Sequence, residues 1–229
     1  ENKQIVGAEA LIRWQHPTKG FMPPLDFIPL AEETGQIVEI GEWVLQETCR
    51  QGLQWIKEGF VPIILAVNVS AEQFKRSDMH EVVQKSLLFT GFPAEQLELE
   101  MTETGLMEQQ DSMVELLKKI RSLGVLLAID DFGTGYSSLA YLKRFPLDTL
   151  KIDKSFIDDI PFNQDDMEIA TTINAMGKTL GFKVLAEGVE NQHQLDFLRM
   201  IGCNTYQGYI KSKPLPADEF SALLTEKIT

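Results

Sequence analysis

Cysteine and histidine are scarce in this sequence of 229 residues. The two cysteines, Cys49 and Cys203, and the three histidines, His16, His80 and His193, do not have the spacing of a zinc site. Two cysteines so far apart also do not indicate a disulfide framework, and we expect two reduced thiols in or near the core. Zinc-dependent and disulfide-rich classes of protein are therefore not expected.

Long apolar runs are absent as well. The run VPIILAV at 61–67 has the length of a strand, and no segment approaches the roughly 20 apolar residues that a membrane-spanning helix needs. The first residues, ENKQ, are polar and lack the apolar region of a signal peptide. We expect a cytoplasmic domain. Because the sequence starts almost at its first strand, we also expect a longer parent protein, in which a sensor or an inner-membrane anchor can precede this domain.

Positive charge is in deficit, because 21 lysines and arginines stand against 34 aspartates and glutamates, and the net charge is −13. Such a chain is repelled by polyanions, so a nucleic-acid polymer or an anionic membrane surface is not an expected partner. A small phosphate ligand remains compatible with this charge if cations offset the acids locally.

Strand-like and helix-like segments alternate along the sequence. Apolar runs predict strands at 5–11, 62–67, 97–101, 125–129, 149–152, 183–186 and 205–206. Helical patterns with glycine or asparagine at their ends predict helices at 25–34, 37–58, 79–89, 111–123, 166–180, 191–201 and 217–227. The alternation indicates crossover units and a parallel sheet, and we predict one α/β domain over residues 1–229, with the organisation of a β/α barrel.

Seven polar residues lie where successive apolar runs end. They are Glu9, Asn68, Glu100, Asp130, Lys151, Glu187 and Gln207. In a β/α barrel the carboxyl ends of the strands form the active-site face. The pattern therefore predicts an acid-rich pocket at that face.

Clustered carboxylates favour a cation, because several ionised acids within a few ångströms repel one another. The acids expected to converge are Glu9, Glu100, Asp130, Asp131 and Glu187, and Asn68 adds a neutral carbonyl oxygen. Oxygen-only ligation favours Mg²⁺ or Mn²⁺ over zinc. The adjacent pair Asp130 and Asp131 can serve two ions, the arrangement used for phosphodiester hydrolysis. Ca²⁺ is expected to inhibit, because it accepts larger and less regular coordination than Mg²⁺. For any single acid, the alternative is a solvated surface charge.

Lys151 and Glu187 are the candidate catalytic groups. Lys151 can hold or polarise an attacking water, or neutralise a phosphate oxygen; the alternative is a structural ion pair with Asp130 or Glu187. Glu187 can be a general base, a metal ligand or both. Glu190 either supports this site or is an acid favoured in the first turn of a helix.

Three further residues carry weaker signals. Arg13 suits a bidentate phosphate contact, and its alternative is a salt bridge to Glu32 or Glu33. Gln207, before Gly208, can read a nucleobase edge, and its alternative is a capping amide. Glu103 has no assignable metal position, so we expect it to accept hydrogen bonds from the loop amides of 133–135.

The motifs resemble those of the EAL-domain cyclic di-GMP phosphodiesterases. The resemblance covers nearly the whole chain, in order: EALIRW at 9–14, NVS at 68–70, EMTE at 100–103, DDFGTGYSSL at 130–139, KID at 151–153, EGVE at 187–190 and QG at 207–208. It implies a modified TIM (β/α)8 barrel whose first strand is antiparallel to the rest. It also implies Mg²⁺- or Mn²⁺-dependent hydrolysis of cyclic di-GMP to linear pGpG.

The family resemblance implies roles for individual residues. Metal ligands match Glu9, Asn68, Glu100, Asp130 and Asp131, and the residues that handle the attacking water match Lys151 and Glu187. Substrate contacts match Leu11, Arg13 and Gln207. Glu103 matches the glutamate that holds the DDFGTG loop, which the family links to homodimerisation. Family members also carry a further strand segment before 1–6, together with sensor or GGDEF domains upstream.

Many relatives of this family have lost these residues and only bind the dinucleotide or other proteins. Since none of the matching residues is lost here, an active enzyme is the first hypothesis. A catalytically silent cyclic di-GMP receptor or a protein-interaction module is the alternative.

Overall fold

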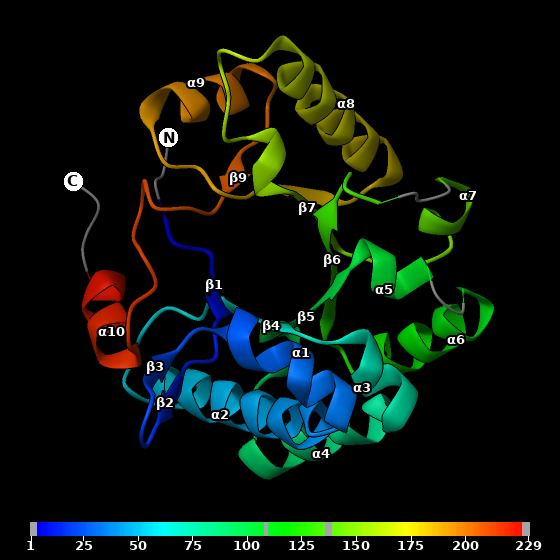
Figure 1. Ribbon diagram of the computed structural model, residues 1–229, viewed down its shortest axis with the longest axis vertical. Helices are drawn as coiled ribbons and strands as arrows, with labels where there is room; N and C mark the ends of the chain where they lie inside the picture. The colour runs from blue at the N-terminus through cyan, green and yellow to red at the C-terminus, as the bar shows by residue number, and fades with distance from the viewer. Residues whose placement is uncertain (1–3, 108–109, 136–138, 226–229) are drawn as a thin grey trace. The chain divides into compact units, whose positions relative to one another are not determined.

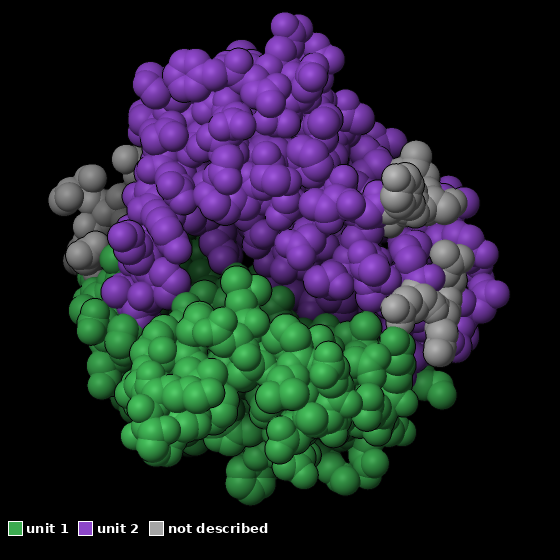
Figure 2. All heavy atoms as spheres, viewed as in Figure 1, with its two compact units in different colours: residues 1–99, 119–125, 216–229 green, residues 100–118, 126–215 purple. Residues whose placement is uncertain are grey.

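The computed structural model describes residues 4–107, 110–135 and 139–225 of the chain. These residues divide into two compact units, which Figure 2 distinguishes by colour. Unit 1 comprises residues 1–99, 119–125 and 216–229, and unit 2 comprises residues 100–118 and 126–215. The expectation of a single domain over residues 1–229 stays a prediction.

Unit 1 contains the first half of the chain and its last helix. Its elements are β1 (Gly7–Ala10), β2 (Trp14–His16), β3 (Gly20–Met22), α1 (Pro24–Thr34), α2 (Ile37–Lys57), β4 (Ile64–Asn68), α3 (Ala71–Arg76), α4 (Met79–Thr90), η1 (Ala94–Gln96) and α10 (Ala217–Thr225). In Figure 1, α2 runs beside α4, against which it packs. The predicted helix end at Gly91 is confirmed, because this residue takes a left-handed conformation with φ of 76°, which glycine adopts without a steric penalty.

Two elements cross the boundary between the units. They are β5 (Leu97–Thr102) and α6 (Gln110–Arg121). The remaining elements belong to unit 2: α5 (Glu103–Met107), β6 (Leu126–Phe132), α7 (Leu139–Leu142), β7 (Thr149–Ile152), η2 (Lys154–Phe156), α8 (Gln164–Leu180), β8 (Lys183–Ala186), α9 (Gln192–Met200) and β9 (Thr205–Tyr206). In Figure 1, α8 and α9 lie in the same region of unit 2 as β7 and β9.

Within the described residues, the main sheet has seven strands in the order β1-β4-β5-β6-β7-β8-β9, and β2 and β3 form a separate antiparallel hairpin. The pairs β1–β4, β6–β7, β7–β8 and β8–β9 are parallel. The antiparallel orientation that the family resemblance implies for the first strand is therefore wrong for β1. The crossover from β1 to β4 contains α1 and α2 and is long enough for parallel pairing, so both strands end at the same edge.

The strands near the middle of the sheet are almost wholly buried. Every residue of β7 and the first five residues of β5 are buried, which explains why these segments read as short apolar runs despite the acids and lysine within them. Lys151 is among the largest fully buried side chains, with 1% of its surface exposed. A buried lysine requires paired charges, so its surroundings define a polar centre within the core.

The region between β1 and α1 differs from the sequence prediction. The sequence predicts no strand between residues 11 and 25, but residues 14–22 form the β2–β3 hairpin, in which Trp14 pairs with Met22. Trp14 packs edge-on against Phe27 of α1, with ring centroids 5.4 Å apart. Three-residue strands are too short to give a period-2 pattern, which explains why the sequence did not reveal them.

None of the helices in the described ranges is long and apolar enough to cross a membrane. The longest of them, α2, has 21 residues and buries one face through Leu45, Cys49 and Trp55, while its other face carries the ion pair of Glu47 with Arg50. This division is typical of a helix that covers a sheet.

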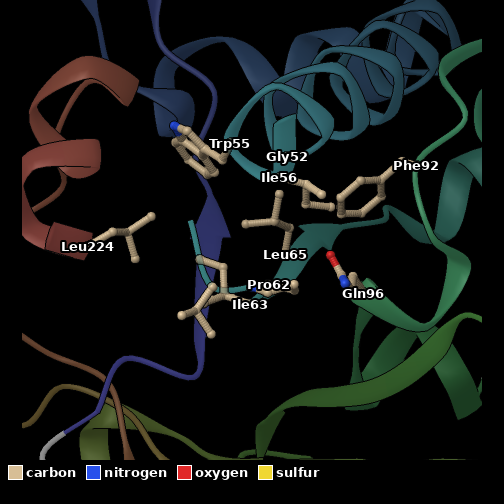
Figure 3. A pocket seen from close by; sticks show the side chains of 10 residues that line it. Gly52, Trp55, Ile56, Pro62, Ile63, Leu65, Phe92, Gln96 and Leu224 are labelled. Atoms are coloured by element: carbon tan, nitrogen blue, oxygen red, sulfur yellow. The ribbon is translucent and has the colours of Figure 1, made fainter. Parts of the chain in front are cut away.

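A small apolar pocket lies at the amino end of β4 in unit 1 (Figure 3). Its lining residues include Trp55 of α2, Leu65 of β4, Leu224 of α10, and Phe92 in the segment after α4. No lining residue is ionisable, and Asn68 lies at the opposite end of the strand. The pocket therefore belongs to the apolar packing of unit 1, and the chemistry must be sought at the carboxyl ends of the strands.

Candidate active site

In unit 1 the parallel pairing of β1 and β4 brings Glu9 and Asn68 together. The register pairs Glu9 with Ala66 and Ala10 with Val67. The Asn68 Nδ2 atom donates a hydrogen bond of 2.5 Å to Glu9 Oε1. Glu9 is half-buried and Asn68 is exposed, so this pair lies at a solvent-accessible edge of unit 1.

In unit 2 the Lys151 ammonium lies among three carboxylates. Its Nζ atom is 2.7 Å from Glu187 Oε1, 2.9 Å from Glu100 Oε2 and 3.2 Å from Asp130 Oδ1. The Lys151 side chain is 1% exposed and that of Glu187 is 16% exposed. Lys151 therefore forms the ion pairs with Asp130 and Glu187 that the structural alternative predicts. Its role in handling the attacking water stays a proposal. One cation against three carboxylates leaves an excess of negative charge, which favours a further cation.

A bulge in β6 sets the directions of Asp130 and Asp131. In a regular strand, adjacent side chains point to opposite faces. Here the register with β7 shifts between Ile129 and Phe132, and Asp131 has a φ of 53°. A bulge re-aims the side chains of its strand, and the left-handed region is tolerated by aspartate. The result is that carboxylate oxygens of Asp130, Asp131 and Glu187 all lie within 4.8 Å of one another.

The environment of Asp131 disfavours its charge. Burial raises the pKa of the Asp131 carboxyl to about 6, and the nearby charges of Asp130 and Asp153 add to the rise, while Lys151 opposes it. Asp153 also shares a hydrogen bond with Asp131. Asp153 was not assigned to the site from the sequence, although it lies two residues after Lys151 in KID. Its place directly after β7, at the carboxyl end of the strand, was the signal that could have found it.

The acids of unit 2 fit a hard divalent cation. Asp130, Asp131 and Glu187 offer only oxygen atoms, at mutual distances that one or two ions can bridge. Burial, the larger cause, and the nearby charge of Asp130 both raise the pKa of Asp131, and a bound cation would offset both effects. Glu187 therefore joins Asp130 and Asp131 as a possible ligand in addition to its candidate role as a base.

Glu103 lies at the start of α5 and is buried, with 2% of its surface exposed. Its Oε2 atom accepts hydrogen bonds from the backbone N–H groups of Gly133, at 2.9 Å, and Gly135, at 3.3 Å. A β-carbon at Gly135 would lie 2.9 Å from Glu103 Oε1, so glycine permits this close approach. The remainder of the DDFGTGYSSL motif, residues 136–138, lies outside the described residues.

Gln207 and Glu190 lie in the segments that follow β8 and β9. The Gln207 backbone N–H donates to Ala186 O at 2.8 Å, and its carbonyl accepts from Val189 N at 3.0 Å. Glu190 forms an exposed ion pair of 2.9 Å with Lys154. Gln207 is therefore fixed beside the end of β8 through its backbone, and Glu190 is connected to the segment after β7.

Leu11 and Arg13 follow β1 in unit 1 and are exposed. Arg13 Nη1 donates to Ile12 O at 2.8 Å. Among the described residues, Arg13 forms no ion pair with Glu32 or Glu33, and Glu32 instead accepts a hydrogen bond of 2.5 Å from Ser70 Oγ. The expected salt-bridge alternative for Arg13 is therefore not found, and the guanidinium can contact a ligand.

Comparison with known proteins adds an independent line of support. The family model described as "EAL domain" matches residues 1–214. The bifunctional diguanylate cyclase/cyclic di-GMP phosphodiesterase MucR of Pseudomonas aeruginosa is 45% identical over 221 residues, covering 96% of this chain and 32% of that protein. The cyclic di-GMP phosphodiesterase NbdA of the same organism is 50% identical over 208 residues, covering 91% of this chain and 27% of that protein. The chain thus spans about a third or less of the length of these relatives.

Solved structures show the same fold. The PaMucR phosphodiesterase in its c-di-GMP complex has a TM-score of 0.90 and 46% identity, covering 94% of this chain and 87% of that one. The cGMP-bound form of the EAL enzyme Bd1971 has a TM-score of 0.89 and 30% identity, covering 98% of this chain and 62% of that one. These matches confirm the fold class predicted from the sequence, and the chain belongs to the EAL domain family.

Proposed function

We propose that this chain is a metal-dependent phosphodiesterase that hydrolyses cyclic di-GMP to linear pGpG. The observation that carries the proposal is the cluster in which the buried Lys151 contacts Glu100, Asp130 and Glu187, with Asp131 beside it. Membership of the EAL domain family and the names of the relatives MucR and NbdA support cyclic di-GMP as the substrate. The same activity is proposed for a longer protein that contains this domain.

The proposed cofactor is Mg²⁺ or Mn²⁺, in a two-ion site with Glu9, Asn68, Glu100, Asp130 and Asp131 as ligands. When bound, such ions supply charge stabilisation at the reacting phosphate and lower the pKa of water. The oxygen-only donor set of the three unit 2 carboxylates whose oxygens lie within 4.8 Å supports this choice of metal.

Glu187 is the proposed general base. An ammonium that contacts three carboxylates is held in its protonated form, so Lys151 is poorly suited to accept a proton. The Glu187 carboxylate can take a proton from the attacking water, while Lys151 holds that carboxylate in place at 2.7 Å. The water oxygen forms a bond to phosphorus, the bond from phosphorus to the 3′ oxygen breaks, and that oxygen gains a proton. The single product, linear pGpG, carries a 5′ phosphate and a free 3′ hydroxyl.

Leu11, Arg13 and Gln207 are the proposed substrate contacts. The exposed Arg13 guanidinium, which has no carboxylate partner among the described residues, suits a phosphate of the dinucleotide. The Gln207 side chain suits a nucleobase edge, because a carboxamide offers both a donor and an acceptor, and its backbone is fixed beside the end of β8. A homodimer formed through the 130–135 loop, and a sensor or GGDEF domain elsewhere in the parent protein, remain proposals as well.

Product analysis tests the proposal directly. The purified domain is incubated with cyclic di-GMP and Mg²⁺, and the nucleotides are separated by chromatography. We expect pGpG to accumulate, and to be absent with a chelator or with the variant Glu9→Ala. Unchanged dinucleotide after long incubation, with binding still detected by calorimetry, would favour the silent receptor; no heat of binding would favour the interaction module.

A further inference from the structure

The two candidate catalytic groups of unit 2 lie at the ends of neighbouring strands. Lys151 is in β7 and Glu187 directly follows β8. The Glu187 backbone N–H donates to Ile152 O at 3.1 Å, and this is the last rung of the pairing. Beyond it the chain leaves the sheet on both sides, through residues 153–158 and 188–191. Some other contact must therefore fix these two segments relative to each other.

Gln194, in the first turn of α9, makes that contact. Its Nε2 group donates to Ile157 O at 3.0 Å and to Asp158 O at 3.2 Å, both in the segment after β7. Its Oε1 atom accepts from Glu190 N at 2.7 Å and Asn191 N at 3.1 Å, both in the segment after β8. Gln194 is 2% exposed, so a single buried amide uses its donors on one segment and its acceptor on the other.

Lys154 connects the same two segments on the solvent side. Its Nζ atom is 2.5 Å from Asp158 Oδ1 and 2.9 Å from Glu190 Oε1. Its aliphatic stem packs on Gly188, where a β-carbon would lie 2.3 Å from Lys154 Cγ and where φ is 68°. Exposed ion pairs contribute little by themselves, so this connection is secondary to the buried one.

We infer that Gln194 is a positioning residue, which sets the separation of Lys151 and Glu187 by joining the segments that follow β7 and β8. This inference rests on the proposed function. Gln194 touches neither reacting group, and it acts through the backbone at 157–158 and 190–191. Small errors in the position of catalytic groups are costly, because about 1 Å of misplacement can reduce a rate about 100-fold.

The competing explanation is that Gln194 only caps α9. It occupies the third position of a capping box with Asn191, whose side chain accepts from Gln194 N at 3.1 Å. Glutamate serves this position of a capping box as well as glutamine does. The variant Gln194→Glu therefore keeps the cap of α9. It loses the two hydrogen bonds that the Gln194 amide donates to Ile157 O and Asp158 O, because a carboxylate oxygen then faces these two carbonyl oxygens.

Asn174→Asp provides the matched control. Asn174 of α8 is also a 2% exposed amide in unit 2, and it donates to Ile201 O at 2.8 Å, away from both segments. The exposed Gln192→Glu adds the same charge to the start of α9 and controls for electrostatics. Each protein is compared by melting temperature, by hydrogen exchange of 153–158 and 187–191, and by kcat and KM for cyclic di-GMP with Mg²⁺.

We expect Gln194→Glu to speed exchange in both segments and to lower kcat by roughly 10- to 100-fold with KM within about twofold of the wild type. Asn174→Asp should lower the melting temperature but leave the exchange of these segments and kcat near wild type, as should Gln192→Glu. Unchanged exchange and kcat in Gln194→Glu would overturn the inference.

If Gln194→Glu does not fold, Gln194→Met decides, because it removes the bonds to both segments without burying a charge. It should speed exchange in the same two segments and lower kcat; no change in either would overturn the inference. If the wild type produces no pGpG, the proposed function fails, while the exchange data still test whether Gln194 joins the segments.

Discussion

The Nζ atom of Lys151 lies 2.7 Å from Oε1 of Glu187, and this contact follows from the register of β7 and β8. Lys151 pairs with Leu185 and Ile152 with Ala186, so Glu187 begins just past the last pair. Parallel register thus brings together two residues that are 36 positions apart in the sequence. Four predictions concern this contact and the residues around it.

Replacement of Lys151 should destabilise the metal-free protein strongly. In Lys151→Met, the carboxylates of Glu100, Asp130 and Glu187 lose their buried cation. Loss of one partner from a buried ion pair costs about 3–5 kcal/mol. Urea unfolding in the presence of a chelator measures this loss. The control Lys118→Met removes an exposed pair with Glu115 and should cost less than about 1 kcal/mol. Equal effects of the two variants would contradict the buried-charge interpretation.

Ionisation of Asp131 should destabilise the metal-free fold as the pH rises. Its pKa is raised from 3.8 to about 6, so the folded state holds this proton more tightly than the unfolded state does. The associated stability is complete below about pH 4 and is lost as the pH rises through about 6. Asp131→Asn, which also tolerates the left-handed backbone, should melt higher than wild type at pH 8 in chelator, by roughly 2–4 °C. Near pH 4 that difference should vanish; a difference that grows toward low pH would refute the prediction.

Glu103→Ala should reduce turnover without removing the metal. Its carboxylate holds the amides of Gly133 and Gly135, so its loss frees the loop that follows Asp130 and Asp131. We expect kcat to fall about tenfold, as for other groups that position a catalytic loop, with a smaller change in the Mg²⁺ affinity measured by titration calorimetry. The exposed Glu115→Gln serves as the control. A large and equal loss of Mg²⁺ affinity would identify Glu103 as a direct ligand.

Calcium should inhibit turnover in the presence of Mg²⁺. The candidate ligands are oxygen atoms that Ca²⁺ also binds, but Ca²⁺ accepts longer and less regular coordination and does not impose the octahedral geometry of Mg²⁺. Chromatography of the product at fixed Mg²⁺ and rising Ca²⁺ should show a progressive loss of pGpG, which excess Mg²⁺ restores. Full activity in Ca²⁺ alone would contradict the two-ion proposal.

The order of strands and helices was readable in the sequence because each element carries its own local signal. Buried parallel strands such as β5 and β7 form short apolar runs, and α4 ends at Gly91 as its sequence indicates. The candidate groups were found for the same reason, since Glu9, Asp130 and Lys151 interrupt or end apolar runs. By contrast, the β2–β3 hairpin gave no local signal, because its three-residue strands are too short to show a period-2 pattern.

The sequence by itself determined the family, the residue types of the site and its preference for a hard cation, because these depend on which side chains are present and in what order. Only the tertiary structure decided their directions. The bulge in β6 turns Asp131 toward Asp130 and Glu187, and the pairing of β7 with β8 places Lys151 against Glu187. The contact of Asp153 with Asp131 and the four bonds of Gln194 were likewise invisible in the sequence. Hydrogen bonds and charge interactions act over a few ångströms in space, and the chain path alone decides which residues come that close.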